Sequence, residues 1–274
     1  MPATYVPVGR IAGVIALAVG IWAIAQGTGA PHWRTLQPGV EFAMLHGEPY
    51  CRRGSSDIAL LRLDPAQVTL RVLHYSREPE RRPFTPIEWR RRYRALAVFN
   101  AGQYYPDLSY MGLLVSGGEP ISTRPHPRFR AALVASPIEG SENARVLDLE
   151  HVTLARARRQ WREIAQSFML FDQRGVLRVR KTDQVANRTV VAEDRHGKLV
   201  VVASEGGYTL WEFAELLERA PLGLSHAMSM DGGHEAELCV ESGRFRYANF
   251  GRWDGATEPE GAVPLPAVIA VLGR

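Results

Sequence analysis

Short apolar or alternating runs recur along the chain from residue 40 onward, and they predict a series of β-strands. The predicted strands are Val40–His46, Asp57–Leu63, Gln67–Leu73, Leu96–Asn100, Leu113–Ser116, Ala131–Ala135, Phe168–Phe171, Thr189–Glu193, Lys198–Ala203, Leu224–Asp231, Glu237–Glu241 and Ala267–Leu272. The Asp64-Pro65 pair predicts a hairpin between the second and third runs. The turn residues Arg195-His196-Gly197 predict another, between Thr189–Glu193 and Lys198–Ala203.

Three segments have the features of a helix. Pro86–Arg94 has a proline in its first turn, and helix signals occupy Leu154–Ala165. A third helix begins near Thr209, because Thr209 and Glu212 have the spacing of a capping box. Many short strands with few helices predict an α+β fold, with helices packed on mixed, mainly antiparallel β-sheets. No linker divides residues 31–274, which we expect to form a single domain of catalytic type.

The stretch Leu224–Gly243 holds the most informative pattern in the chain. Read with the period of a strand, one face is bulky (Leu224, His226, Met228, Met230) and the other is small and ends in a carboxylate (Ser225, Ala227, Ser229, Asp231). Gly232 and Gly233 follow at once and permit a sharp turn. One interpretation is a hairpin that returns through Glu237–Glu241. The other is a carboxylate at a strand end, beside amides that bind an anion.

Residues 1–30 have the pattern of an export signal. Arg10 precedes an uninterrupted apolar run, Ile11–Ala25, and small residues follow up to Ala30. The run is shorter than the roughly 20 residues of a comfortable membrane-spanning helix. We therefore expect either a cleaved signal peptide or an N-terminal anchor formed by residues 11–25, and a protein exported to the periplasm or the extracellular space.

Export changes the interpretation of the only two cysteines, Cys51 and Cys239. Neither belongs to a C-x-x-C pair or has zinc-ligand spacing. In an oxidising compartment the simplest expectation is one long-range disulfide between them. Two buried free thiols are the alternative.

The net charge of +4 reflects an excess of basic residues and is compatible with anionic partners without identifying one. The segment IEWRRRYR at 87–94 combines basic and aromatic residues, as nucleic-acid patches do, but a solvated helix face with Trp89 and Tyr93 packed inward is favoured. The sequence has no Walker loop, no dinucleotide-binding glycine pattern after a strand and no H-E-x-x-H motif. We therefore expect no nucleic acid partner and no metal site, and the sequence requires no cofactor.

Four motifs, in order, resemble those of one family. Asn100-Ala101-Gly102 is similar to its N-G-G-F-F stretch, and Gln166–Leu170 is similar to Q-S-G-P-x-L. Asn187-Arg188-Thr189 corresponds to its R-T element, and TLWEFAELLERAPLG followed by HAMSMDGG resembles a T-L-x-E-L-A helix leading to A-L-x-L-D-G-G. The family is that of the phosphodiester glycosidases, which includes the enzyme that uncovers mannose 6-phosphate. The chain departs from the family pattern at Ala101, Gln103, Phe168, Met169 and His234–Ala236.

The resemblance implies roles for particular residues. Arg188 would bind the phosphate with its guanidinium fork, and a salt bridge within the protein is the alternative for it. Asp231 and Glu205 would supply the two carboxylates of a glycosidase, although a solvated turn residue is the favoured interpretation of Glu205. Asn100 would hydrogen-bond sugar hydroxyls or developing charge. The remaining expected site residues are Gly232 and Gly233, with Gln166 and Ser167 as polar wall residues or simply satisfied loop groups.

The resemblance therefore implies an exported hydrolase that cleaves a sugar-1-phosphate diester, on cell-envelope or extracellular glycopolymers. Its partner would be a phosphorylated sugar or glycopolymer. The alternative is a non-catalytic glycan- or phosphate-binding module of the same fold, and the changes at His234–Ala236 favour it.

Overall fold

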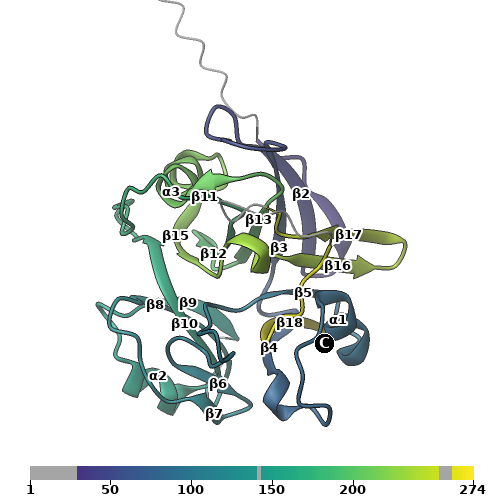
Figure 1. Cartoon of the computed structure of the whole chain (residues 1–274), viewed down its shortest axis with the longest axis vertical. Helices are drawn as coiled ribbons and strands as arrows, with labels where there is room; N and C mark the ends of the chain where they lie inside the picture. The colour runs from purple at the N-terminus through teal and green to yellow at the C-terminus, as the bar shows by residue number, and fades with distance from the viewer. Residues whose placement is uncertain (1–29, 141–142, 253–260) are drawn as a thin grey trace, which may run out of the picture.

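Two antiparallel sheets pack face to face in the computed structural model, which describes residues 30–140, 143–252 and 261–274 (Figure 1). The larger sheet has the order β1 (Arg34–Gln37), β2 (Val40–His46), β3 (Asp57–Leu63), β13 (Leu199–Ser204), β12 (Thr189–Asp194), β15 (Leu224–Ser229), β10 (Trp161–Phe171), β6 (Leu114–Ser116) and β7 (Glu119–Ser122). In the same sheet, β8 (Ala131–Pro137) pairs with β10, and β9 (Ala144–Asp148) pairs with β8. The smaller sheet has the order β17 (Phe245–Asn249), β16 (Leu238–Ser242), β5 (Ala97–Asn100), β18 (Ala267–Gly273) and β4 (Val68–His74).

The described helices lie outside the two sheets. They are α1 (Pro86–Tyr93), α2 (Leu154–Gln160) and α3 (Leu210–Arg219), with the short 3₁₀ turns η1 (Tyr75–Arg77) and η2 (Gly233–Glu235). A separate two-stranded pair joins β11 (Val185–Ala186) to β14 (Tyr208–Thr209). Strands dominate this α+β fold, and every pairing between described strands is antiparallel rather than mixed.

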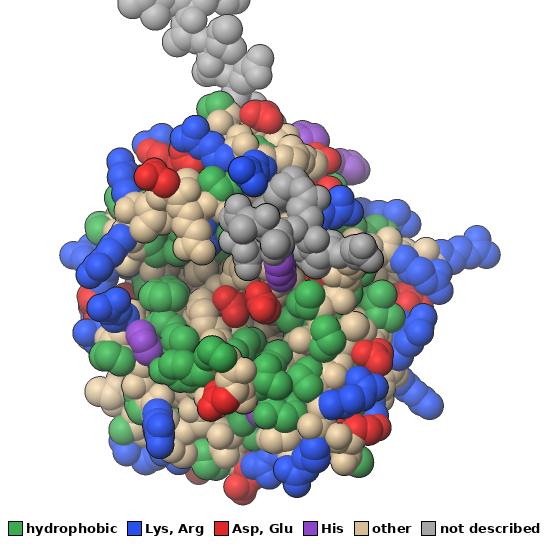
Figure 2. Space-filling view, in the orientation of Figure 1, with side chains coloured by type: hydrophobic (Ala, Val, Ile, Leu, Met, Phe, Trp, Pro, Cys, Tyr) green, Lys and Arg blue, Asp and Glu red, His purple; other side chains and the backbone are tan. Residues whose placement is uncertain are grey.

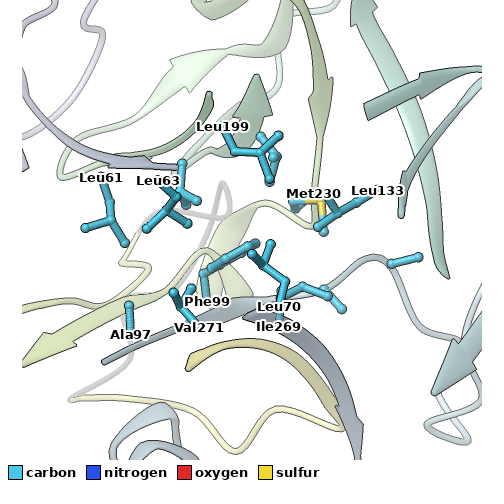
Figure 3. Close-up of a cluster of buried hydrophobic side chains, with 14 of the residues drawn as sticks. Leu61, Leu63, Leu70, Ala97, Phe99, Leu133, Leu199, Met230, Ile269 and Val271 are labelled. Carbon is cyan, nitrogen blue, oxygen red and sulfur yellow. The ribbon is translucent and has the colours of Figure 1, made fainter. Parts of the chain in front are cut away.

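The main hydrophobic core lies between the two sheets (Figure 3). Leu61 and Leu63 of β3 point into it from the larger sheet, and Phe99 and Ile269 approach from the smaller one. Full burial of side chains of this size stabilises the fold by about 1.5–3 kcal/mol each. Because the alternate residues of β3 face a second core under α3, both faces of this strand are buried and its sequence is almost continuously apolar.

The helices complete the outer layers as their sequences predict. Thr209 caps α3 through the amide of Glu212, and Phe213 packs on the outer face of the larger sheet. On the smaller sheet, Trp89 of α1 is buried and its indole donates to the Leu265 carbonyl at 3.0 Å. Tyr93 packs against the hydrophobic cluster that contains Trp89. The aromatic residues of the basic segment 87–94 therefore face inward, as the favoured interpretation expects.

The hairpin predicted at Asp64-Pro65 is wrong, and so is the hairpin interpretation of Asp231-Gly232. At each point the chain leaves the larger sheet and crosses to the smaller one: β3 is followed by β4, and β15 by β16, and neither pair shares hydrogen bonds. The physical reason is that these strands bury both faces and pair with partners distant in sequence. The hairpin of β12 with β13 is confirmed.

The helix predicted at Leu154–Ala165 ends early, at Gln160. Trp161 begins β10, whose first half pairs with β8 along Trp161–Ser167 and whose second half pairs with β15. Pairing with two neighbouring strands overrides the local helix propensity, and Trp161 and Ile164 enter the core under α2.

The predicted disulfide is also wrong, because both cysteines are free thiols. The Cys51 sulfur lies in a loop near the carbonyl oxygens of Arg53 and Ser55, at 3.3 and 3.4 Å. Cys239 is buried in β16, where it pairs with Val98 of the smaller sheet. The two thiols therefore belong to different layers of the fold.

The expected export signal falls on residues 1–29, outside the described part of the chain, apart from Ala30. Among the described residues no helix is long and apolar enough to span a membrane. The export signal stays a prediction.

Glu163 on β10 is a buried carboxylate that links this strand to β4 and to the turn between β6 and β7. It is 4% exposed and accepts hydrogen bonds from the amides of Val72 and Gly117, both at 3.0 Å. Burial raises its pKa from 4.5 to about 7. Since the folded state then binds a proton more tightly than the unfolded state, the free energy of unfolding falls as the pH rises through the window from about 4.5 to about 7.

We expect Glu163→Gln to remove this pH dependence. The wild type should lose about 2 kcal/mol more stability than the variant between about pH 5 and about pH 8, because only the wild type must ionise a buried group. Urea unfolding at both pH values measures the difference, and other titrating groups cancel between the two proteins. Parallel pH profiles would contradict the assignment.

Candidate active site

Asp231 lies where the chain leaves β15 and crosses between the sheets. Its carboxylate Oδ1 accepts from the Gly232 amide at 2.9 Å, and its own carbonyl accepts from Asn100 Nδ2 at 2.9 Å. Because Asn100 belongs to β5 of the smaller sheet, it holds the crossing segment in place from the opposite layer. Asn100 is fully buried and does not line the cavity described below, so the structure gives it a positioning contact.

The two glycines permit a close approach of the backbone to Arg188. A Cβ on Gly232 would lie 3.0 Å from the Asn187 carbonyl and 3.2 Å from Arg188 Nη1, and Gly233 has a left-handed φ of 74°. The Gly233 amide donates to the Asn187 carbonyl at 3.0 Å, and the Gly232 amide is bonded to Asp231. Both amides are therefore satisfied within the protein, which leaves the anion-binding role to side chains.

Arg188 is a buried guanidinium beside Asp231. It is 8% exposed, and its Nε and Nη2 donate to the carbonyls of Tyr208 and Gln184 at 3.0 and 2.8 Å. Burial lowers its pKa to about 10, while the nearby Asp231 carboxylate opposes the shift. It forms no ion pair with another described residue, whereas a salt bridge within the protein was the alternative role expected for it.

Two carboxylates, Asp231 and Glu235, line one cavity together with Arg188. Burial and the neighbouring Glu235 raise the pKa of Asp231 well above its usual range, against the opposing effects of the Gly232 amide and Arg188. Glu235 was not a sequence candidate. Its only signal is its position four residues after Asp231, at the end of the 3₁₀ turn η2.

Glu205, the expected second carboxylate, lies outside this cavity. Its Oε1 accepts from the Tyr247 hydroxyl at 2.9 Å, on β17 of the smaller sheet. Glu205 is half-buried and bonded, so it has a structural contact rather than the solvated turn position that was its favoured interpretation.

Gln166 and Ser167 support the cavity wall from behind. Gln166 is 1% exposed, and its side chain makes four hydrogen bonds to backbone groups of residues 113, 126 and 129, between 2.9 and 3.1 Å long. The Ser167 hydroxyl donates to Gln103 Oε1 at 3.4 Å, and Gln103 Nε2 donates to the Met230 carbonyl at 3.2 Å. Gln103, noted in the sequence only as a departure from the family pattern, is the one of the three that lines the cavity.

The cavity has a volume of about 990 Å³ and opens on the face drawn in Figure 2, where acidic side chains lie in a hollow near the centre. Apolar wall residues include Met111, Phe129, Phe168 and Leu210, and basic ones include Arg128, Arg130, Arg178 and Arg180. The described residues contain no group of three or more His, Cys, Asp or Glu side chains arranged to hold a metal ion. A buried cation, two carboxylates and apolar walls together suit a small ligand that carries an anionic group.

A sequence model of the phosphodiester glycosidases matches residues 93–272, which include Asn100, Arg188 and Asp231. The chain belongs to this family. The match covers most of both sheets and every residue that we place at the cavity. No match to a curated protein was found.

Solved structures of low sequence identity share the fold of this chain. The catalytic domain of zebrafish N-acetylglucosamine-1-phosphodiester alpha-N-acetylglucosaminidase, auto-inhibited by its pro-peptide, has a TM-score of 0.60 at 15% identity, over 90% of this chain and 88% of that one. A hypothetical protein from Synechocystis has a TM-score of 0.58 at 15% identity, over 89% of this chain and 64% of that one. A putative exported protein from Burkholderia pseudomallei K96243 has a TM-score of 0.53 at 12% identity, over 79% of this chain and 74% of that one.

Proposed function

We propose that this protein is a hydrolase that cleaves a sugar-1-phosphate diester. The observation that carries the proposal is the meeting of Arg188, Asp231 and Glu235 at one cavity, although 43 residues separate the first two in sequence (231 minus 188). Membership of a glycosidase family supports a hydrolytic reaction. The buried guanidinium supports a phosphate rather than a neutral aglycone.

Arg188 is oriented to receive the phosphodiester. The Tyr208 and Gln184 carbonyls accept hydrogen bonds from Nε and Nη2. The remaining nitrogen, Nη1, lies beside the backbone of Gly232. A buried arginine without an ion pair gains a charged partner when a phosphate binds. The phosphate is thereby placed beside Asp231.

Asp231 acts as the proton donor in this proposal. Its raised pKa favours the protonated form, and a bound phosphate anion, which neutralises Arg188 and adds like charge, strengthens the shift. As the bond from the anomeric carbon to the phosphate oxygen breaks, Asp231 gives its proton to that oxygen. Glu235 supplies the second carboxylate: as a base it takes a proton from a water whose oxygen bonds to the anomeric carbon, or as a nucleophile it forms a glycosyl ester that water then hydrolyses. The products are the free sugar and a phosphomonoester.

A panel of sugar-1-phosphate diesters tests the proposal, with the matching neutral glycosides as controls. We expect the purified protein to release sugar from at least one diester and from none of the neutral glycosides. The value of kcat/KM should fall as the pH rises through the raised pKa of Asp231, because the proton donor is lost. Failure to cleave any diester would contradict the proposal.

A non-catalytic glycan- or phosphate-binding module remains the second candidate. The observation that favours it is Phe168, which lines the cavity at a position where the family pattern has glycine. Binding of a sugar phosphate without turnover, unchanged by Asp231→Asn, would support this candidate.

A further inference from the structure

Three exposed arginines, Arg128, Arg130 and Arg180, line the same cavity as the buried Arg188. We call these three residues the arginine rim. None of them forms an ion pair with another described residue. Arg178 also lines the cavity, but it differs from the rim because it is paired with Asp172 and Glu150. Among the residues that the structure describes, the rim is therefore an excess of positive charge without a paired carboxylate.

The segment that carries Arg128 and Arg130 is fixed by buried contacts. Gln166 bonds to the His126 amide and to the carbonyls of His126 and Phe129. Between the two arginines, the Phe129 ring is buried and packs edge-on against Phe168, with centroids 4.4 Å apart. With Phe129 anchored inward, both flanking arginines are exposed at the cavity.

Arg180 comes from a different part of the chain, two residues after the paired Arg178. The Arg178 amide donates to the Leu170 carbonyl at 2.8 Å, and its guanidinium nitrogen Nη1 lies 3.1 Å from Asp172 Oδ2. The segment before Arg180 is thus tied to β10. Two separately anchored segments bring cations to one cavity, as expected for a binding surface rather than a chance surface cluster.

One phosphodiester does not account for this charge. A phosphodiester carries a single negative charge, and Arg188 already faces it inside the cavity. Exposed cations at the opening of a cavity of low-dielectric walls attract further anions, and they act within a Debye length of about 8–10 Å at physiological salt. The rim therefore suits negative groups on the part of the substrate that lies outside the cavity.

We propose that the substrate is a polyanion: an oligomer or polymer of sugar or polyol units joined by several phosphodiesters. Arg188 binds the phosphate at the cleaved bond, and the arginine rim binds phosphates of neighbouring units. This inference rests on the proposed hydrolase function and adds the class of substrate to it.

Two substrates with the same cleavable sugar-1-phosphate group test the inference: one with a single phosphate, and one that continues through several phosphodiester-linked units. The test variant is R128Q/R130Q/R180Q. Its matched control is R156Q/R158Q/R159Q on α2, which removes the same charge from exposed arginines that do not line this cavity. Circular dichroism confirms the fold of each.

We expect the rim variant to lower the ratio of kcat/KM for the oligomer to that for the single-phosphate substrate by about tenfold, because three weak exposed ion pairs act together. The preference for the oligomer should also weaken with added salt in the wild type and less in the rim variant. The α2 variant should leave the ratio unchanged, and R128K/R130K/R180K should restore most of it, since it keeps the charge.

Direct binding of a fluorescent poly(glycerol phosphate) oligomer separates this inference from the hydrolase proposal. Absence of turnover with rim-dependent binding would contradict the proposed reaction and leave the rim as a polyanion site. Equal effects of the rim and α2 variants would overturn the inference. It would also be overturned if a single-stranded oligonucleotide with the same number of phosphates bound as tightly, because the rim would then not select a sugar- or polyol-phosphate chain.

Discussion

Replacement of Asp231 by asparagine is expected to lower kcat/KM for a sugar-1-phosphate diester by about 10²–10⁴-fold, the range typical for loss of a general acid. Asparagine has the same size, and its carbonyl oxygen still accepts from the Gly232 amide. The backbone carbonyl that bonds to Asn100 is unaffected. The free energy of unfolding at neutral pH should not fall, because the variant no longer carries a carboxyl group whose ionisation is opposed by burial.

Initial rates on the best diester of the panel, together with urea unfolding, measure both effects. The matched control is Glu119→Gln, which removes an exposed carboxylate on β7 and should change neither quantity. Full activity in Asp231→Asn would contradict the role of this residue as proton donor. A large loss of stability would instead mean that the carboxylate supports the crossing segment.

Replacement of Arg188 by lysine is expected to raise KM for the diester by about 10–100-fold with a smaller change in kcat. Lysine keeps the charge but lacks the planar fork that donates to Tyr208 and Gln184, and loss of a charged hydrogen bond costs about 1.5–3 kcal/mol. The Tyr208 and Gln184 carbonyls lose their donors, and the bond to Tyr208 is buried, so the free energy of unfolding should also fall by about 1–3 kcal/mol.

Steady-state kinetics and inhibition by a phosphomonoester product measure this effect, because the product should bind more weakly in proportion to KM. Arg195→Lys is the matched control: it is an exposed arginine in the turn between β12 and β13. If Arg188→Lys keeps the KM of the wild type, the phosphate is bound elsewhere in the cavity.

The positions of the strands could be read from the sequence, but their partners could not. The predicted ends of β2 and β3 agree with the structure, because turn residues flank their apolar runs. The same turn residues, at Asp64-Pro65 and Asp231-Gly232, serve equally well for a hairpin and for a crossing between layers. A strand buried on both faces has no polar face to indicate its sheet, so the sequence did not contain the information that decides the pairing.

The same limit applies to the site. Asp231 and Arg188, which line the cavity, could be proposed from the sequence because a strand-end carboxylate and an arginine in a family motif are local signals. Glu205 and Glu235 each lie close to a pair of glycines, and only the three-dimensional structure shows that Glu235 lines the cavity while Glu205 bonds to Tyr247. Gln166 was expected at the wall, but its four bonds to the backbone make it a support for the segment 126–130.

The bond from Asn100 to the Asp231 carbonyl joins residues 131 positions apart in the chain: Asn100 lies in β5 of the smaller sheet, and Asp231 lies in the segment that leaves β15 of the larger one. A fragment limited to the larger sheet therefore lacks the contact that holds the Asp231 segment in place. Contacts between residues so far apart in sequence form late and slowly during folding, because a long loop must close first. The return of enzymatic turnover after dilution from denaturant would consequently report the moment at which the two layers dock, whereas far-ultraviolet spectra would respond earlier, when individual strands pair.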